Sequence, residues 1–204
     1  MTVEQLNGGE ALIEVLRHHG VEHVFCSPGS EWHPVWEGLA RLRANGEAAP
    51  TYINCRHEGL AVAAATGYTK VTGRPQAVLL HTNVGILNAA LFIRAAYHEQ
   101  VPMLICAGEG VAFGEDPAVR DPGRHWLTQL SDVNHPAALV APYVKWQGEV
   151  RSPFTLVPVL EQAMQIAITP PQGPVALSIP LEVLLSPVGA AAVAGHRVCQ
   201  VSPA

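Results

Sequence analysis

Residues 52–67 read Tyr-Ile-Asn-Cys-Arg-His-Glu-Gly-Leu-Ala-Val-Ala-Ala-Ala-Thr-Gly, a short apolar strand that runs directly into an alanine-rich helix. The corner between strand and helix carries Arg56, His57 and Glu58. A carboxylate at such a corner has its protonation tuned by burial and by the helix N-terminus. We therefore predict that Glu58 is the main functional residue. The alternative is that Glu58 is only a favourable acid in the first turn of a helix.

Strands and helices alternate on both sides of this corner. Buried apolar runs without polar alternation, such as residues 76–82 and 101–107, are typical of parallel strands covered on both faces. We therefore expect an α/β fold with three layers, a mostly parallel sheet with helices on both faces. The expected strands are residues 21–26, 51–54, 76–82, 101–107, 143–146 and 174–179, and the expected helices include residues 58–72, 153–168, one that opens at residues 7–10 and one that follows residue 88.

Polar and glycine-containing segments follow four of the expected strands. They are residues 27–30, 56–58, 81–85 and 107–109. Ligands of open α/β sheets bind beyond the carboxyl ends of the strands, so we expect these segments to form one site. The irregular segment 108–124 is long for a compact domain, which indicates a functional loop. We expect residues 1–185 to form one domain and residues 186–204 to be a linker-like tail.

Composition excludes several classes of partner. The chain has 204 residues and a net charge of −5, and its 12 Lys and Arg residues are scattered, which argues against nucleic acid or an anionic membrane as a partner. No apolar stretch is long enough to span a bilayer and no signal peptide opens the chain, so we expect a cytoplasmic protein. Only 14% of residues are charged, which indicates burial against another subunit.

The cysteines and histidines do not form a metal-binding motif. The four cysteines are far apart, without zinc spacing, and most follow apolar strands, which indicates buried free thiols. The ten histidines include no pair at helical spacing with a nearby carboxylate. We expect that this chain supplies no metal ligand.

A set of ordered motifs resembles the thiamine-diphosphate-dependent enzymes related to acetolactate synthase and benzoylformate decarboxylase. The likeness is to their N-terminal pyrimidine-binding domain. The motifs are Gly20-Val-Glu-His-Val-Phe, Pro28-Gly-Ser30, Arg56-His-Glu58 with Ala-Thr-Gly67-Tyr, Gly85 with Asn88, Val101-Pro-Met-Leu-Ile-Cys-Ala-Gly108 and Gly173-Pro-Val-Ala-Leu-Ser-Ile-Pro180.

The resemblance implies a role for each matching residue. Glu58 matches the glutamate that hydrogen-bonds the cofactor's pyrimidine N1′ and so activates the thiazolium carbon. Ser30 and His81 resemble substrate-binding and proton-relaying residues of benzoylformate decarboxylase; the alternatives are an N-cap for Ser30 and a plain strand-end residue for His81. His57 is expected to pack beside Glu58 or tune it. The other implied cofactor contacts are Pro28, Gly29, Thr82, Gly85 and Asn88.

The family's diphosphate-binding segment, Gly-Asp-Gly followed by Asn, does not occur in this sequence. The resemblance therefore implies a split enzyme, in which a second subunit holds the diphosphate and Mg²⁺ and this chain contributes the pyrimidine side. Sulfopyruvate decarboxylase-like enzymes are divided in this way. We expect a hetero-oligomer that decarboxylates or ligates a 2-oxo acid. The alternatives are a regulatory or scaffolding module with the same fold, and a fragment of a single-chain enzyme.

Overall fold

Eight strands and six α-helices make up the described part of the chain. The structure is a computed structural model, and it describes residues 5–27, 29–110, 133, 135–189 and 193. The strands are β1 (Gln5–Asn7), β2 (His23–Ser27), β3 (Thr51–Asn54), β4 (Gln76–Leu80), β5 (Met103–Glu109), β6 (Trp146–Glu149), β7 (Pro174–Pro180) and β8 (Pro187–Gly189). The helices are α1 (Gly8–His18), α2 (His33–Ala44), α3 (Glu58–Thr72), α4 (Thr82–His98), α5 (Pro153–Ile168) and α6 (Leu181–Leu185), with 3-10 segments η1 (Ser30–Trp32) and η3 (Pro136–Tyr143).

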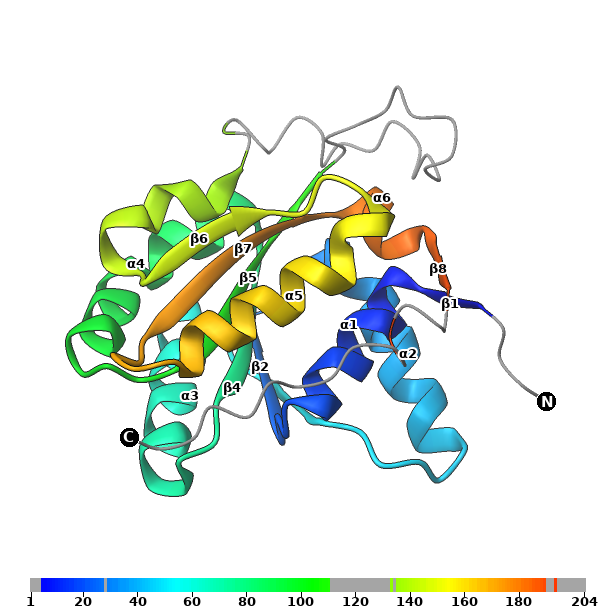
Figure 1. Ribbon diagram of the computed structural model, residues 1–204, viewed down its shortest axis with the longest axis horizontal. Coiled ribbons are helices and arrows are strands. Elements are labelled where there is room, and N and C mark those ends of the chain that lie inside the picture. Colours follow the sequence, from blue (N-terminus) through cyan, green and yellow to red (C-terminus); the bar gives the residue numbers. More distant parts are fainter. Residues whose placement is uncertain (1–4, 28, 111–132, 134, 190–192, 194–204) are drawn as a thin grey trace.

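Six of the strands form one parallel sheet in the order β3-β2-β4-β5-β7-β6 (Figure 1). Every pairing in this sheet is parallel. Helices α1, α2 and α5 cover one face, and α3 and α4 cover the other. This arrangement confirms the predicted α/β fold with helices on both faces of a parallel sheet.

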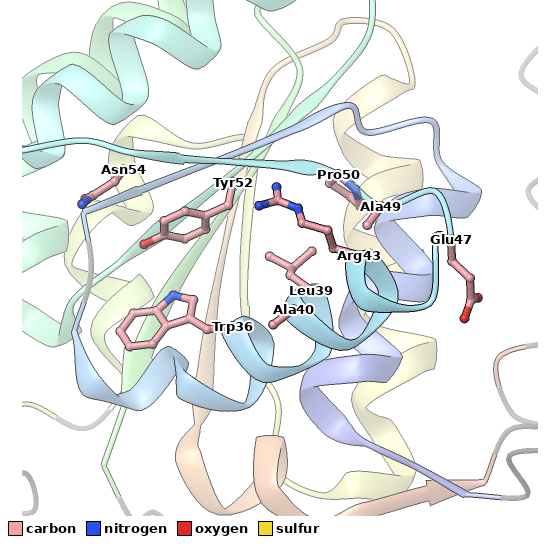
Figure 2. A pocket seen from close by; sticks show the side chains of 10 residues that line it. Trp36, Leu39, Ala40, Arg43, Glu47, Ala49, Pro50, Tyr52 and Asn54 are labelled. Carbon is pink, nitrogen blue, oxygen red and sulfur yellow. The ribbon is translucent and has the colours of Figure 1, made fainter.

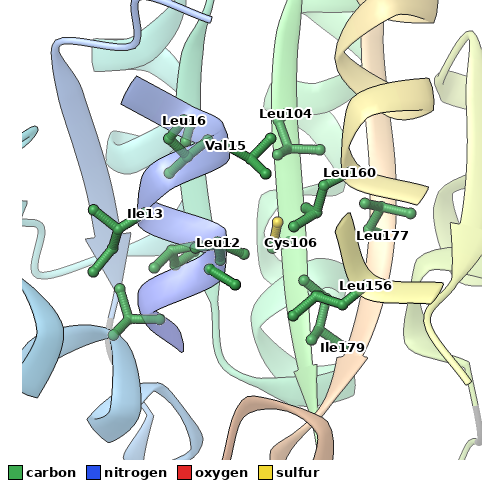
Figure 3. Packing of buried hydrophobic residues seen from close by; sticks show 14 of the residues in the cluster. Leu12, Ile13, Val15, Leu16, Leu104, Cys106, Leu156, Leu160, Leu177 and Ile179 are labelled. Atoms are coloured by element: carbon green, nitrogen blue, oxygen red, sulfur yellow. The ribbon is translucent and has the colours of Figure 1, made fainter. Parts of the chain in front are cut away.

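Two hydrophobic clusters fill the spaces between sheet and helices. On the first face, Leu12 and Val15 of α1 and Leu160 of α5 pack over Leu104 and Cys106 of β5 (Figure 3). On the second face, side chains of α3 and α4 pack against alternate residues of the same strands, because successive strand residues point to opposite faces. Strands β4, β5 and β7 are buried along their whole length, as their continuous apolar sequences predicted.

Local signals fix the ends of the helices. Asn7 caps α1 in a capping box, in which its side chain accepts from the Glu10 N–H and the Glu10 carboxylate accepts from the Asn7 N–H. Helix α3 ends at Gly73, whose φ of 71° lies in the left-handed region that glycine tolerates best. The predicted bounds of α3 and α5 agree with the structure residue for residue.

Several predicted boundaries differ from the structure, including those of β2, which is His23–Ser27, and of β5, which begins at Met103. Strand β4 ends at Leu80 and α4 begins at Thr82, so residues 82–88 are helical rather than the end of a strand and a loop. Gly108 and Glu109 extend β5 rather than opening an irregular segment. Residues 136–143 form the 3-10 segment η3, and the following strand begins at Trp146, later than predicted, because its register is set by pairing with β7. Residues 111–124 of the expected functional loop lie outside the described residues.

The first residues of the expected tail are part of a small second sheet. Strand β8 pairs with β1 in antiparallel register, with Leu6 opposite Val188. Ser186 is buried, and its backbone carbonyl accepts from the N–H of Gly8 at 3.0 Å. Residues 187–189 are therefore paired strand rather than linker. The rest of the expected tail lies outside the described residues, apart from the buried Val193.

Among the helices that the structure describes, none combines the length and the apolar character needed to cross a membrane.

Candidate functional site

The four polar segments predicted to meet lie at one edge of the sheet. They follow β3, β2, β4 and β5, which are consecutive neighbours in the strand order. The connection that follows β2 leads to β3 on one side, whereas the connection that follows β4 leads to β5 on the other side. The crevice beyond the carboxyl ends of β2 and β4 is thus a switch point of the kind where open α/β sheets bind ligands.

Glu58 occupies the corner between β3 and α3. Its neighbour His57 is the N-cap of α3, and the His57 Nδ1 accepts from the N–H of Gly59 at 3.0 Å. His57 is thus a helix cap, and its predicted packing beside Glu58 or tuning of it stays a prediction. The cap fixes Glu58 as the first residue of the helix, where the positive end of the helix dipole favours a carboxylate.

Asn88 of α4 holds the Glu58 side chain in place. The Asn88 Nδ2 donates to Glu58 Oε2 at 2.5 Å. Gly85 lies one turn earlier, and a Cβ there would lie 3.6 Å from Glu58 Cγ, at ordinary contact distance. The structure thereby brings together Glu58, Gly85 and Asn88, three of the predicted cofactor-contacting residues. Glu58 remains partly exposed and Asn88 is exposed.

Glu31 is the site residue that sequence reasoning missed. Its side chain is fully buried, and both carboxylate oxygens lie within 3.0 Å of His81 Nδ1. A Cβ at Gly29 or Gly108 would come within about 2.2 Å of the Glu31 side chain. These two glycines therefore leave the space that Glu31 fills. The signal in the sequence was an acid directly after Pro28-Gly-Ser30, a position that also suits the first turn of a helix.

His81 is held by this buried carboxylate. The hydrogen bond to Glu31 raises the pKa of His81 above its usual value, burial opposes that shift, and the charge of Glu58 adds to it. Because a buried carboxylate accepts best from a charged donor, the pairing favours the imidazolium. His81 is the N-cap residue of α4 by position, but its side chain caps no backbone N–H. The Glu31 contact therefore accounts for its orientation.

Thr82 adopts a strained backbone conformation next to His81. Its φ is 38°, in the left-handed region that β-branched residues rarely adopt. Its Oγ1 is buried and has no hydrogen-bond partner among the described residues. Strained residues with unsatisfied polar atoms cluster at functional sites. The predicted cofactor contact at Thr82 is consistent with this geometry.

The remaining predicted residues lie at the start of η1 or directly before it. Ser30 is exposed and is the first residue of η1, while the N-cap of α2 is Trp32. Ser30 is therefore not the N-cap of α2. Gly29 lies against His81, since a Cβ on Gly29 would be 2.0 Å from His81 Nδ1. Pro28 lies outside the described residues.

Replacing Glu31 by Gln is expected to lower the pKa of His81. The pairing raises that pKa above the unpaired value of 6.5, so its contribution to folding stability is complete below pH 6.5. That contribution is lost as the pH rises through the raised pKa. NMR titration of the His81 ring protons measures the change. Glu14→Gln on α1 is the matched control, because Glu14 pairs with Arg17 rather than with a site residue. An unchanged His81 titration in Glu31→Gln would contradict the assignment.

A second buried carboxyl group lies at the end of β5. Glu109 is 2% exposed, and its Oε1 accepts from the N–H of His135 at 2.8 Å. Its other oxygen has no hydrogen-bond partner among the described residues. Burial raises the pKa of Glu109 to about 7, and the nearby charges of Glu149 and Glu182 add to that rise. Glu109 therefore titrates near neutral pH.

The Glu109→Gln variant is expected to remove part of the pH dependence of folding. Because the folded state holds the Glu109 proton up to a pKa of about 7, stability of the native chain falls between pH 4.5 and 7 as the unfolded state releases that proton. At pH 8 the variant should be more stable by about 3 kcal/mol, and near pH 4 equally stable. Urea unfolding at several pH values measures this, with the exposed Glu99→Gln as control. Parallel stability curves for native chain and variant would refute the prediction.

An apolar surface runs along α3 and α4 beside Glu58. We call it the α3/α4 face, and it consists of exposed residues at helical spacing. On α3, Leu60 and Val71 are 57% and 87% exposed, and on α4, Leu91 is 70% exposed. Exposed apolar surfaces of this kind are typical of interaction sites. The other members of the α3/α4 face are Ala64, Gly67, Val84 and Leu87.

Among the described residues, no group of three or more His, Cys, Asp or Glu side chains is arranged to hold a metal ion.

Comparison with known proteins defines the family to which this chain belongs. Residues 6–135 match the family model of the thiamine pyrophosphate enzymes' N-terminal TPP binding domain. The chain belongs to this family.

Two curated relatives carry the likeness over most of the chain. An acetolactate synthase of Arthrospira platensis is 31% identical over 183 residues, which is 89% of this chain and 29% of that protein. A benzoylformate decarboxylase of Pseudomonas aeruginosa is 32% identical over 174 residues, which is 84% of this chain and 29% of that protein. The chain thus spans less than a third of the length of these relatives.

The fold matches a solved structure of the same class. The thiamine diphosphate-dependent 4-hydroxybenzoylformate decarboxylase of Rhodococcus jostii superposes with a TM-score of 0.77 at 26% identity, over 96% of this chain and 34% of that one. The family and the fold that the sequence motifs predicted are both confirmed. The roles predicted for individual residues stay predictions.

Proposed function

We propose that this chain is the pyrimidine-binding half of a thiamine-diphosphate-dependent enzyme that decarboxylates or ligates a 2-oxo acid. Glu58 is the group that hydrogen-bonds the pyrimidine ring and exchanges a proton with N1′. The observation that carries this proposal is the Glu58 carboxyl at the head of α3, held by Asn88, at the switch point of the sheet. The cofactor, when bound, supplies a thiazolium carbon that adds to the substrate's keto group.

The residues present fit the pyrimidine end of thiamine diphosphate. Glu58 Oε1 makes no hydrogen bond to a described residue, whereas Oε2 is held by Asn88. One oxygen is thus oriented and the other is available to a ring nitrogen. The unsatisfied Oγ1 of Thr82 adds a polar group at the same edge, and the backbone of Gly29 lies directly against His81. In this proposal His81 and Ser30 contact the substrate, and Glu31 keeps His81 able to donate a proton.

The diphosphate, together with Mg²⁺, is held in this proposal by a second subunit. The observation that favours a second subunit is the α3/α4 face, which exposes a row of apolar side chains beside Glu58. Glu58 itself is only partly buried by this chain, whereas proton exchange with a cofactor is most effective where water is excluded. A partner domain packed on the α3/α4 face would remove water from Glu58 and complete the site.

Co-expression tests the proposal. The chain is produced together with a polypeptide that carries a Gly-Asp-Gly diphosphate-binding segment, and CO₂ release from a panel of 2-oxo acids is measured with thiamine diphosphate and Mg²⁺. We expect a stable complex whose activity requires both polypeptides and the cofactor. A complex that forms without cofactor-dependent turnover of any substrate would instead favour the scaffolding alternative.

A further inference from the structure

A cavity of about 630 Å³ lies away from the Glu58 site, between α2 and the edge strand β3 (Figure 2). Trp36, Leu39 and Arg43 of α2 form one side, and Tyr52 and Asn54 of β3 form the other. The loop between α2 and β3, including Pro50, closes one end. The volume is in the range of small-molecule pockets, roughly 300–1,000 Å³.

Tight packing of α2 on α1 explains why this cavity exists. A Cβ on Gly9 of α1 would lie 2.6 Å from the backbone of Pro34, and a Cβ on Gly38 would lie 2.7 Å from Ile13 Cδ1. These glycines let α2 approach α1 closely. Tyr52 pairs in register with Val24, which belongs to the core on the α1 side of the sheet. Tyr52 therefore points to the face that α2 leaves only partly covered.

The walls of the cavity are aromatic and aliphatic. In Figure 2 the indole of Trp36 on α2 and the ring of Tyr52 on β3 lie near each other at one end of the cavity, with Leu39 beside them. Burial raises the pKa of Tyr52, so its phenol stays neutral in the physiological range. Two neighbouring aromatic rings with aliphatic side chains beside them suit a flat apolar ligand, because stacked and edge-to-face ring contacts add to the free energy of burial.

One cation without a partner reaches into this cavity. The guanidinium of Arg43 extends over it toward Tyr52 in Figure 2. Arg43 forms no ion pair with a described residue, whereas Arg41 on the same helix pairs with Glu10. The only acid among the lining residues described is Glu47, which points away from the cavity in Figure 2 and accepts from Asn45 Nδ2 at 3.2 Å. The pocket thus offers a positive charge that no carboxylate of the described chain neutralises.

We propose that this cavity is a binding site for a small aromatic carboxylate, with its ring packed against Trp36 and Tyr52 and its carboxylate on Arg43. The planar guanidinium fork of arginine matches a carboxylate in two parallel hydrogen bonds. Asn54 lines the cavity and ends β3, four residues before Glu58. A ligand held here therefore contacts the strand that leads to the Glu58 corner without occupying that corner.

Titration of the full chain with benzoate as the probe tests this site. Amide NMR shifts are expected to saturate at the lining residues, with a Kd on the order of 1 mM for a ligand of this size. Arg43→Gln should weaken benzoate binding about tenfold, because it removes one charge-assisted contact. The matched control Arg41→Gln, two residues away on the same helix, should leave binding unchanged. Benzamide, the neutral analogue, should bind the native chain and Arg43→Gln alike.

A second variant tests the cavity without changing its charge. Ala40→Leu places a larger side chain into the space while keeping a good helix former on α2, and it should abolish the benzoate shifts. An amide spectrum that otherwise matches the native one shows that each variant folds. The proposal is overturned if saturable shifts are absent from the lining residues, or if Arg43→Gln binds benzoate as well as the native chain does.

Discussion

Replacement of Glu58 by glutamine is expected to lower cofactor activation about 10²–10⁴-fold in the proposed two-subunit enzyme, the usual contribution of a positioned acid or base. Glutamine keeps the size of the side chain and its contact with Asn88, but it cannot exchange a proton with a ring nitrogen. The measurement is the rate of hydrogen–deuterium exchange at the thiazolium carbon, followed by NMR.

Assembly and cofactor binding should persist in this variant, because the helix cap at His57 and the α3/α4 face are untouched. Glu99→Gln, at the far end of α4 and paired with Lys70, is the matched control. Exchange at the native rate in Glu58→Gln would remove Glu58 from its proposed role. It would leave the family assignment of the chain intact.

Truncation of Leu104 to alanine is expected to destabilise the folded chain by about 2–5 kcal/mol. Leu104 lies on the central strand β5, is fully buried and packs between α1 and α5 (Figure 3). Its loss removes apolar contacts and leaves a cavity that the surrounding helices cannot close, because strands on both sides of β5 fix the backbone. Urea unfolding of the isolated chain measures the effect.

Leu91→Ala is the control for Leu104→Ala. Leu91 is 70% exposed on the α3/α4 face, so its truncation should change the free energy of unfolding of the isolated chain by no more than about 0.5 kcal/mol. The same variant should weaken binding of the proposed partner subunit. Equal losses of stability for Leu91 and Leu104 would show that the α3/α4 face is not a free surface in the isolated chain.

Much of this site was predictable because parallel sheets place all their carboxyl ends at one edge. Once residues 56–58, 81–85 and 107–109 were assigned to the ends of strands, their meeting followed from the fold class. Glu58 was identifiable from local sequence alone, as an acid at the start of a well-marked helix. His57 as the cap of that helix was not, because histidine is an uncommon N-cap residue.

Glu31 was not predictable, because its burial depends on residues far away in the sequence. Gly108 on β5 leaves the space for the carboxylate, and His81 after β4 supplies the donor. The sequence does not show that Gly108 and His81 lie next to Glu31. That follows only from the strand order, which places the ends of β4 and β5 near the turn after β2. The pairing of β8 with β1 was missed because the two strands lie at opposite ends of the described chain. Each strand is also only three residues long, which leaves little pattern in the sequence.

The sequence by itself determined the parallel α/β fold, the family and the position of Glu58, because periodicity, helix caps and ordered motifs are local properties of the chain. The tertiary structure alone decided which side chains meet Glu58 and His81, how much of Glu58 stays exposed, and where α2 leaves a cavity beside β3. These features depend on the distances between helices and strands. Close packing at glycines such as Gly38 and Gly108 sets those distances.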